Sequence, residues 1–245
     1  MLGVGSALLY LHEEWAQCVL YRDIKPSNLM LDECFKVKLG DFGLARLVDH
    51  GQGSHTTMLM GTVGYMDPES MITGKASKES DVYSFGVVVL EIITGRRPIL
   101  VLQGNKTVTI HLVQLVWELY GEGRILEAAD TRLNGEFDKQ QMERMMVAAL
   151  CCVHPDSSQR PSIGDAVNMI RYQAKLPNLP DKMPVATFVL PIESFLSQPL
   201  DTTGTSGSNI YGTGTSTTRS STYSTGTTSS SSGVQSEAPV PSLLR

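Results

Sequence analysis

Apolar and polar positions alternate with recognisable periods over the first 176 residues of the chain. Two short apolar runs, 29–31 and 37–39, enclose a polar stretch and predict a small β-hairpin. Elsewhere apolar residues recur every three or four positions, which predicts helices. These helical patterns cover an opening segment marked by Val4, Leu8, Leu11 and Trp15, and the ranges 110–120, 139–153 and 162–176.

Residues 81–94 differ from the other helical segments because they are apolar nearly all the way round. The segment is too long for an ordinary strand, and Gly95 and Pro98 follow it, so we expect a buried helix with a glycine C-cap. The fold class predicted for residues 1–176 is therefore mainly α, with one hairpin.

The pattern changes at residue 177. Prolines recur through 177–200, which excludes a continuous helix and predicts an extended, Pro-rich linker. Residues 201–245 are dominated by Ser, Thr and Gly and contain too little apolar surface to offset the entropy of ordering, so we expect a disordered tail. Such a tail is either inert and solvated or a site of phosphorylation or docking.

Charge and cysteine content narrow the class of protein. The net charge of −5, from 20 basic and 25 acidic residues, argues against a nucleic-acid partner. The longest apolar stretch, 85–90, ends at Glu91 and is too short to span a membrane, and the N-terminus lacks the basic segment of a secretory signal. The four cysteines are Cys18, Cys34, Cys151 and Cys152, and no two of them have the Cys-x-x-Cys spacing. We therefore expect reduced thiols in a cytosolic chain.

One group of polar residues has the spacing that phosphoryl transfer requires. Asp23 is followed five residues later by Asn28, in a Pro-containing loop that leads into the predicted hairpin. Asp41-Phe42-Gly43 comes directly after the second hairpin strand. Asn28 and Asp41 could supply hard oxygen ligands to Mg²⁺, while Asp23 acts on a substrate hydroxyl. Each motif alone is a weak signal, but the ordered combination is strong.

These residues resemble the eukaryotic protein kinase family. Five motifs match in order: Tyr21-Arg22-Asp23 with Asn28, Asp41-Phe42-Gly43, Asp67-Pro68-Glu69, the segment 80–86 and Arg160-Pro161. The strings YLHEEW…RDIKPSNLMLD, KLGDFGLARL, GTVGYMDPE and SDVYSFGVVVLEIITGRRP look like plant receptor-like Ser/Thr kinases, closest to the L-type lectin receptor kinases. The resemblance implies the helical C-terminal lobe of a kinase, with the hairpin carrying the catalytic and magnesium loops.

The resemblance also implies catalytic roles and the cofactors ATP and Mg²⁺. Asp23 matches the catalytic aspartate, and Lys25 matches the lysine that neutralises the transferring γ-phosphate in Ser/Thr kinases. Asn28 and Asp41 match the magnesium ligands. Thr62 matches the threonine that positions the substrate.

Regulatory and structural roles follow in the same way. Arg22 makes this an Arg-Asp kinase, whose arginine receives a phosphate from the activation segment, and the candidates for that phosphate are Thr56 and Thr57. The matched structural residues are Asp81, which braces the catalytic loop, and Arg160, which pairs with Glu69. The sequence departs from the family motifs at two positions, with Tyr21 in place of His and Asp67 in place of Ala. We expect both to be tolerated, and we expect Tyr21 to pack under the magnesium motif.

The larger departure is the absence of a Gly-x-Gly-x-x-Gly loop followed by a strand, and of a strand lysine in a Val-Ala-x-Lys setting. The N-terminal lobe that would hold the nucleotide is therefore expected to lie outside residues 1–245. The first hypothesis is a Ser/Thr protein kinase acting on protein substrates at the cytosolic side of the plasma membrane, inactive as the isolated chain. The alternative is a non-catalytic kinase-lobe fragment that binds proteins. A small-molecule phosphotransferase also has an Asp-x4-Asn motif. That class lacks the long activation segment ending in Pro-Glu, which this sequence has, so the comparison argues against it.

Overall fold

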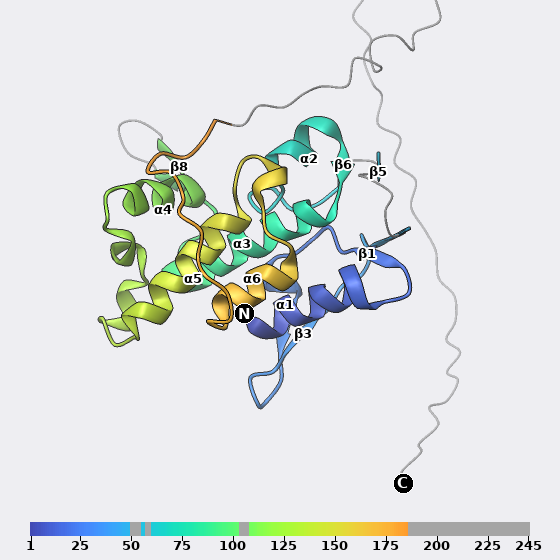
Figure 1. The fold of residues 1–245 in the computed structure, drawn as a ribbon, viewed down its shortest axis with the longest axis horizontal. Helices are drawn as coiled ribbons and strands as arrows, with labels where there is room; N and C mark the ends of the chain where they lie inside the picture. The colour runs from blue at the N-terminus through green and yellow to red at the C-terminus, as the bar shows by residue number, and fades with distance from the viewer. Residues whose placement is uncertain (50–54, 57–59, 103–107, 186–245) are drawn as a thin grey trace, which may run out of the picture. The chain divides into compact units, whose positions relative to one another are not determined.

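The computed structural model describes residues 1–49, 55–56, 60–102 and 108–185. Within these residues helices dominate, as the sequence predicts, and the strands are short (Figure 1). The α-helices are α1 (Leu2–Leu9), α2 (Pro68–Thr73), α3 (Lys78–Thr94), α4 (Leu112–Gly121), α5 (Lys139–Cys152) and α6 (Ile163–Ile170). Short π and 3₁₀ helices are η1 (Tyr10–Glu14), η2 (Pro26–Asn28), η3 (Ile125–Ala128), η4 (Thr131–Leu133) and η5 (Ser157–Gln159).

The described strands form antiparallel pairs. The pair β2 (Leu29–Leu31) and β3 (Val37–Leu39) is the predicted hairpin, with Leu29 opposite Leu39. The pairs missed by the sequence pattern are β1 (Cys18–Leu20) with β4 (Arg46–Val48), β5 (His55–Thr56) with β6 (Lys75–Ala76), and β7 (Ile99–Leu102) with β8 (Val108–His111). Strands of two to four residues are too short to display an alternation of their own, so their pairing is decided by the tertiary fold.

Helix α3 is the centre of the core, and both of its ends are capped by the sequence. Ser77 and Ser80 form a reciprocal capping box at the N-terminus, and Gly95 closes the C-terminus in the left-handed conformation, as expected. The helix begins at Lys78, three residues before the predicted start, because the cap lies at Ser77. Helices α4 and α5 pack against α3, and α6 packs against both α5 and α1 (Figure 1).

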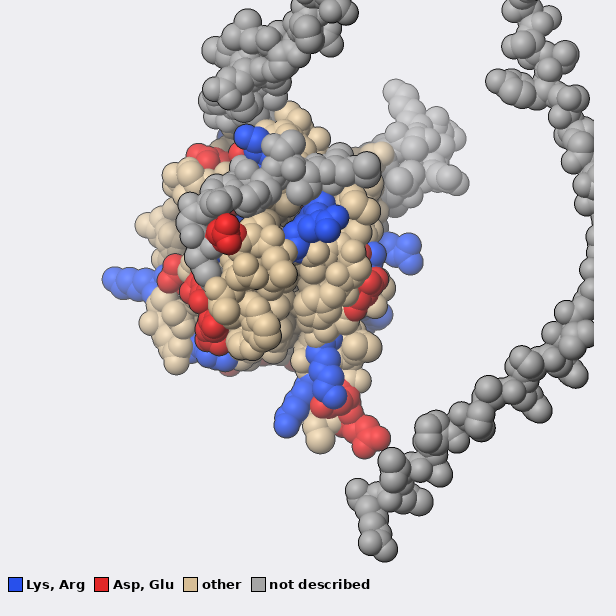
Figure 2. All heavy atoms as spheres, turned by 90° about the vertical axis from the view of Figure 1, so that its right-hand side faces the viewer, with Lys and Arg blue, Asp and Glu red and all other residues tan. Residues whose placement is uncertain are grey.

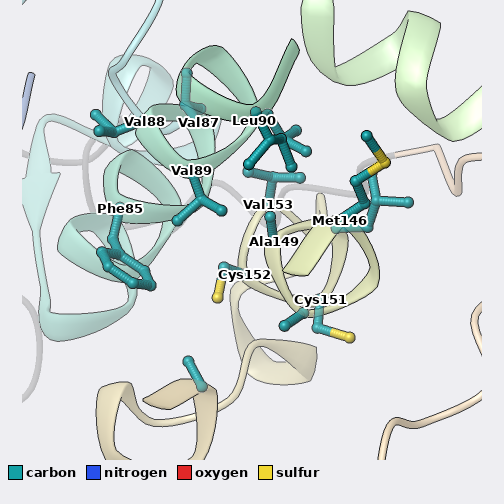
Figure 3. Packing of buried hydrophobic residues seen from close by; sticks show 14 of the residues in the cluster. Phe85, Val87, Val88, Val89, Leu90, Met146, Ala149, Cys151, Cys152 and Val153 are labelled. Carbon is teal, nitrogen blue, oxygen red and sulfur yellow. The ribbon is translucent and has the colours of Figure 1, made fainter. Parts of the chain in front are cut away.

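The contact between α3 and α5 brings two backbones unusually close. Val89 and Leu90 of α3 lie toward Ala149 of α5 and toward Val153, the C-cap residue of α5 (Figure 3). A Cβ atom on Gly86 would come within 2.7 Å of Cys152 Cβ, so only glycine fits at this crossing. The buried helix predicted from the apolar segment is therefore a tightly packed one.

The last predicted helix ends earlier than its apolar period suggests. Helix α6 stops at Ile170, and Tyr172 takes a left-handed φ of 64°. The guanidinium of Arg144 donates to the carbonyl oxygens of Met169 and Ala174 and lies 4.3 Å from the Tyr172 ring centroid. Arg144 thus satisfies the Met169 carbonyl in the last turn of α6 and also holds the backbone beyond the helix at Ala174.

Residues 177–183, here called the C-terminal strap, cross α4. Trp117 Nε1 donates to the carbonyl oxygen of Pro180 at 3.0 Å, and the backbone N–H of Leu179 donates to Tyr120 Oη at 3.3 Å. Leu179 and Met183 pack against the core. The packed chain therefore continues past residue 176, although the strap contains no helix, as its prolines predict. The predicted disordered tail, 201–245, lies outside the described residues.

The docked strap leaves no room for a side chain at Gly121, because a Cβ there would lie 1.9 Å from the carbonyl oxygen of Asp181. Replacing a helical Gly by Ala ordinarily stabilises by about 1 kcal/mol. For Gly121→Ala we expect the opposite sign, a loss of about 1–3 kcal/mol in the free energy of unfolding, because the strap must move. Urea denaturation measures the change. Gly164→Ala in α6 is the control, since its Cβ meets nothing closer than 3.4 Å; equal stabilisation by both variants would contradict the docked strap.

Candidate active site

Charged side chains do not gather into one patch on the face shown in Figure 2, where acidic and basic residues are interspersed over a mainly uncharged surface. The buried polar residues are more informative. In the described part of the chain they are His12, Arg22, Asp23, Asn28, Asp67, Ser80, Asp81, Ser84, Thr94 and Arg160. Several of them meet around the loop that precedes the hairpin, so the candidate site begins there.

Asp23 lies at the centre of a hydrogen-bonded cluster that contains the residues expected from the sequence. Its carboxylate accepts from Thr62 Oγ1 at 2.6 Å and pairs with Lys25 Nζ at 2.7 Å. Lys25 Nζ also donates to Thr62 Oγ1 at 2.9 Å. Asp23 is buried, whereas Lys25 is partly exposed, so the carboxylate is held in place by neighbours that still reach solvent. The structure thus brings together Asp23, Lys25 and Thr62, which are up to 39 positions apart.

Asn28 joins this cluster through its amide. Its Nδ2 donates to the backbone oxygen of Asp23 at 2.9 Å and to the Asp23 carboxylate at 3.2 Å. Pro26 starts the short helix η2 where its missing N–H is harmless, and this turn aims Asn28 back at Asp23. Because the amide nitrogen faces Asp23, the amide oxygen is the atom that remains for a cation.

Asp41 follows strand β3 and is held in a conformation that few residues adopt. Its φ is 51°, and its Oδ1 accepts the backbone N–H of Gly43 at 3.2 Å. The backbone N–H of the preceding Gly40 donates to the backbone oxygen of Asn28 at 2.9 Å, so the hairpin brings the Asp41 segment to the catalytic loop. The Asp41 side chain is exposed.

Asn28 and Asp41 suit Mg²⁺ better than a transition metal. Within the described residues no group of three or more His, Cys, Asp or Glu side chains could hold a metal ion. Two oxygen ligands from the protein are instead typical of a Mg²⁺ that completes its coordination with substrate phosphates and water. The donor set therefore fits the metal that the sequence predicts.

Tyr21 links the catalytic loop to the Asp41 segment. Its hydroxyl donates to the carbonyl oxygen of Gly40, and its ring meets the Phe42 ring edge-on at 5.2 Å between centroids. Burial, opposed by a hydrogen bond to Asn28, raises the pKa of Tyr21 to about 12, so the hydroxyl stays protonated and remains a donor. Tyr21 thus packs against the segment that contains Asp41-Phe42-Gly43, as expected.

Asp81, in the first turn of α3, holds the backbone of the same loop. Its carboxylate accepts the backbone N–H groups of Tyr21 at 2.7 Å and Arg22 at 2.8 Å, and His12 Nε2 lies 3.0 Å away. Asp81 and His12 are each 1 % exposed. Arg22 has a φ of 73°, an unfavourable conformation for a non-glycine residue, which these bonds help to maintain.

Arg22 is buried near charges of both signs. Burial first, and then the charge of Arg46, lowers the pKa of the Arg22 guanidinium, while the charge of Asp81 opposes this shift. The backbone of Thr56 is described in β5, opposite Lys75 of β6. Thr57, the other predicted phosphate site, lies outside the described residues.

The predicted pairing of Arg160 with Glu69 is wrong, because Arg160 pairs with Asp67. Arg160 Nη2 lies 2.7 Å from Asp67 Oδ1, and both side chains are buried. Asp67 is the N-cap of α2 and accepts the backbone N–H groups of Glu69 and Ser70, so its carboxylate faces inward whereas Glu69 is only partly buried. The sequence could have indicated this pairing, because Asp67 precedes a proline at the first helical position and is therefore a typical N-cap residue.

Comparisons with known proteins give the family of the chain. The family model described as "Protein kinase domain" matches residues 1–170. The chain is 57 % identical over 188 residues to L-type lectin-domain containing receptor kinase IX.1 of Arabidopsis thaliana, which covers 76 % of this chain and 29 % of that protein. It is 52 % identical over 204 residues to receptor kinase IX.2 of the same plant, and 50 % identical over 182 residues to the S.7 receptor kinase of rice, Oryza sativa subsp. japonica.

The predicted similarity to L-type lectin receptor kinases is confirmed by these matches. The chain spans about 30 % of the length of the two Arabidopsis relatives, 29 % of one and 30 % of the other. No helix among the described residues is both long and apolar enough to cross a membrane.

Proposed function

This chain belongs to the protein kinase family, and on that premise we propose that it is the C-terminal lobe of a receptor-like protein Ser/Thr kinase. The observation that carries the proposal is the buried carboxylate of Asp23, held between Lys25, Thr62 and the amide of Asn28. The substrates are Ser or Thr hydroxyls of proteins, the phosphoryl donor is ATP, and the site of action is the cytosolic side of the plasma membrane.

Each residue of the cluster has a role that its contacts support. Asp23 orients the substrate hydroxyl and accepts its proton, because its carboxylate is fixed at the centre of the cluster. Lys25 places a positive charge beside that carboxylate, where the γ-phosphate arrives. Thr62 ties the activation segment to Asp23 and so positions the protein substrate.

Asn28 and Asp41 would hold Mg²⁺, which, when bound, would neutralise charge on the phosphates. The chain itself holds the Asn28 amide against Asp23, and the Asp41 carboxylate accepts the backbone N–H of Gly43. Arg22 would receive a phosphate from the activation segment, at Thr56 or Thr57, and Asp81 holds the backbone of Arg22 for that purpose.

The 245 residues contain no Gly-x-Gly-x-x-Gly phosphate loop and no lysine in a Val-Ala-x-Lys setting. We therefore propose that the chain alone does not bind ATP usefully and that an N-terminal lobe must complete the nucleotide site. Large apolar side chains around the hairpin are exposed, as expected of a surface that another part of the protein covers: Met30, Leu31, Phe42 and Leu47. The same surface supports the alternative, a lobe that binds proteins without transferring phosphate.

Calorimetry separates these two functions. We expect the isolated chain to show no micromolar affinity for Mg-ATP, because positioning and neutralising the phosphates needs groups that the chain lacks. The same chain fused behind the N-terminal lobe of a close relative should bind Mg-ATP and phosphorylate Ser or Thr in a generic protein substrate. A micromolar dissociation constant for the isolated chain would overturn the first expectation, and a fused protein that binds Mg-ATP without transferring phosphate would favour the binding module.

A further inference from the structure

Helix α4 meets the C-terminal strap through aromatic side chains that the proposed phosphoryl transfer does not use. Trp117 and Tyr120 lie one helical turn apart on α4 and carry the polar groups that face the strap. Gly121 follows directly, and the carbonyl oxygen of Asp181 lies closer to it than a Cβ atom would allow. The surface formed by Trp117, Tyr120 and Gly121 is here called the strap site.

Among the described residues, the hydrogen bonds between α4 and the strap all use backbone atoms of the strap. Trp117 Nε1 donates to the carbonyl oxygen of Pro180 at 3.0 Å. Tyr120 Oη accepts the backbone N–H of Leu179 at 3.3 Å and donates to the carbonyl oxygen of Leu179 at 3.5 Å. Contacts of this kind recognise the course of an extended chain, so another peptide with the same backbone course would satisfy them equally.

The sequence of the strap is that of a ligand for such a site. Residues 177–180 read Pro-Asn-Leu-Pro, which is a Pro-x-x-Pro segment. Prolines restrict the free chain to extended conformations, so binding costs little conformational entropy, and domains that bind Pro-x-x-Pro peptides do so with aromatic side chains. Leu179 adds an apolar contact because it packs against the core. One chain therefore contains both a receptor surface and its ligand.

The strap is held less firmly than the helices beneath it. Only Leu179 and Met183 in the strap have partly buried side chains, and the others are exposed. Segments with few buried contacts open at a small cost in free energy, without global unfolding. A cavity of about 430 Å³ lies beside the strap, lined by Gln114 and Glu118 of α4 and by residues 181–184. A bulkier peptide would gain contacts there that the strap does not make.

We propose that the strap site is a peptide-binding site for another protein, one that presents an extended Leu-Pro-x-Leu-Pro segment. The strap, which follows Leu176 and continues the same pattern, occupies the site as an intramolecular competitor. The partner would bond to Trp117 and Tyr120 through its own backbone and would extend into the cavity. The proposal is independent of phosphoryl transfer, because no residue of the Asp23 cluster takes part.

The test follows the indole N–H signal of Trp117 by NMR in the 245-residue chain, which has one other tryptophan. The probe is an unlabelled peptide with the sequence of residues 176–184. Leu179→Asp should release the strap, because it places a carboxylate against the core, and should shift the Trp117 signal. The peptide should then return the signal to its wild-type position at concentrations below about 1 mM, the effective concentration at which a tethered strap competes.

Asn178→Asp is the matched control, since it adds the same charge one position earlier on an exposed side chain. Its Trp117 signal should match that of the wild-type chain, and both should respond only weakly to the peptide because the strap is in place. In the Leu179→Asp chain, adding Tyr120→Phe should weaken peptide affinity about fivefold, because the backbone of the peptide loses a hydrogen-bond partner. Adding Gly121→Ala should abolish binding, because a Cβ occupies the place of the peptide backbone.

Circular dichroism checks that the released chain is folded. If Leu179→Asp does not fold, Leu179→Ala takes its place, because it removes the apolar contact without burying a charge. A folded, released chain that ignores the peptide, or that binds it equally well with Tyr120→Phe and with Gly121→Ala, would overturn the proposal. A wild-type chain that sediments as a dimer, and as a monomer after Leu179→Asp, would show that the site takes the strap of a second copy and would reject a partner of another kind.

Discussion

Replacing Asp81 by Ala should lower the free energy of unfolding by about 3–6 kcal/mol, a large part of the stability of a typical domain. The carboxylate is 1 % exposed and accepts from the backbone N–H groups of Tyr21 and Arg22, with His12 beside it. The alanine variant leaves these donors buried without an acceptor, and each such donor costs about 1–3 kcal/mol. The strained backbone of Arg22 also loses its support.

Urea denaturation of the chain measures this loss, with Glu79→Gln as the control. Glu79 lies in the same first turn of α3 but its side chain is exposed, so removing its charge should change the stability by less than about 0.5 kcal/mol. Asp81→Asn keeps the shape and one acceptor oxygen, so it should fall between the wild-type chain and Asp81→Ala. Equal stabilities for Asp81→Ala and Glu79→Gln would show that the catalytic loop does not depend on Asp81.

The candidate site was largely predictable because its signals are local in sequence. Asp23 and Asn28 are separated by one turn-forming loop. The hairpin that carries the chain from Asn28 to Asp41 is marked by two apolar runs on either side of a polar turn. The long helix α3 was also predictable, since its apolar run ends at a glycine cap. In each case a single local rule, of spacing or of capping, decides the structure.

The features that the sequence did not predict depend on partners far along the chain. Arg160 reaches Asp67 across 93 positions, and the choice of Asp67 over Glu69 depends on which carboxylate the N-cap turns inward. The strap is polyproline-like in composition, yet Trp117 and Gly121 make a surface on which it docks. The pairing of Thr56 with Lys75 involves two-residue strands, which have no period. Tertiary packing, rather than local propensity, decides all three.

The same geometry predicts different defects for the two acidic residues of the proposed active site. In the kinase restored by an N-terminal lobe, Asp41→Asn should abolish phosphorylation and weaken Mg-ATP binding, because it removes a charged ligand from the expected Mg²⁺ site. Asp23→Asn should lower kcat by about 10²–10⁴-fold while KM for ATP stays nearly unchanged. Asp23 is surrounded by Lys25, Thr62 and Asn28, and in the role proposed above it would face the substrate hydroxyl and not the nucleotide.

Steady-state kinetics with Mg-ATP, together with calorimetric ATP binding, separates the two roles. Glu33→Gln at the exposed tip of the hairpin is the control, since it makes the same change of charge near the site without touching the cluster, and it should match the parent kinase. If Asp23→Asn weakens ATP binding as much as Asp41→Asn does, the assignment of one residue to the hydroxyl and the other to the metal is wrong. If neither variant changes turnover, the buried Asp23 cluster is not the site of phosphoryl transfer, and the lobe acts by binding alone.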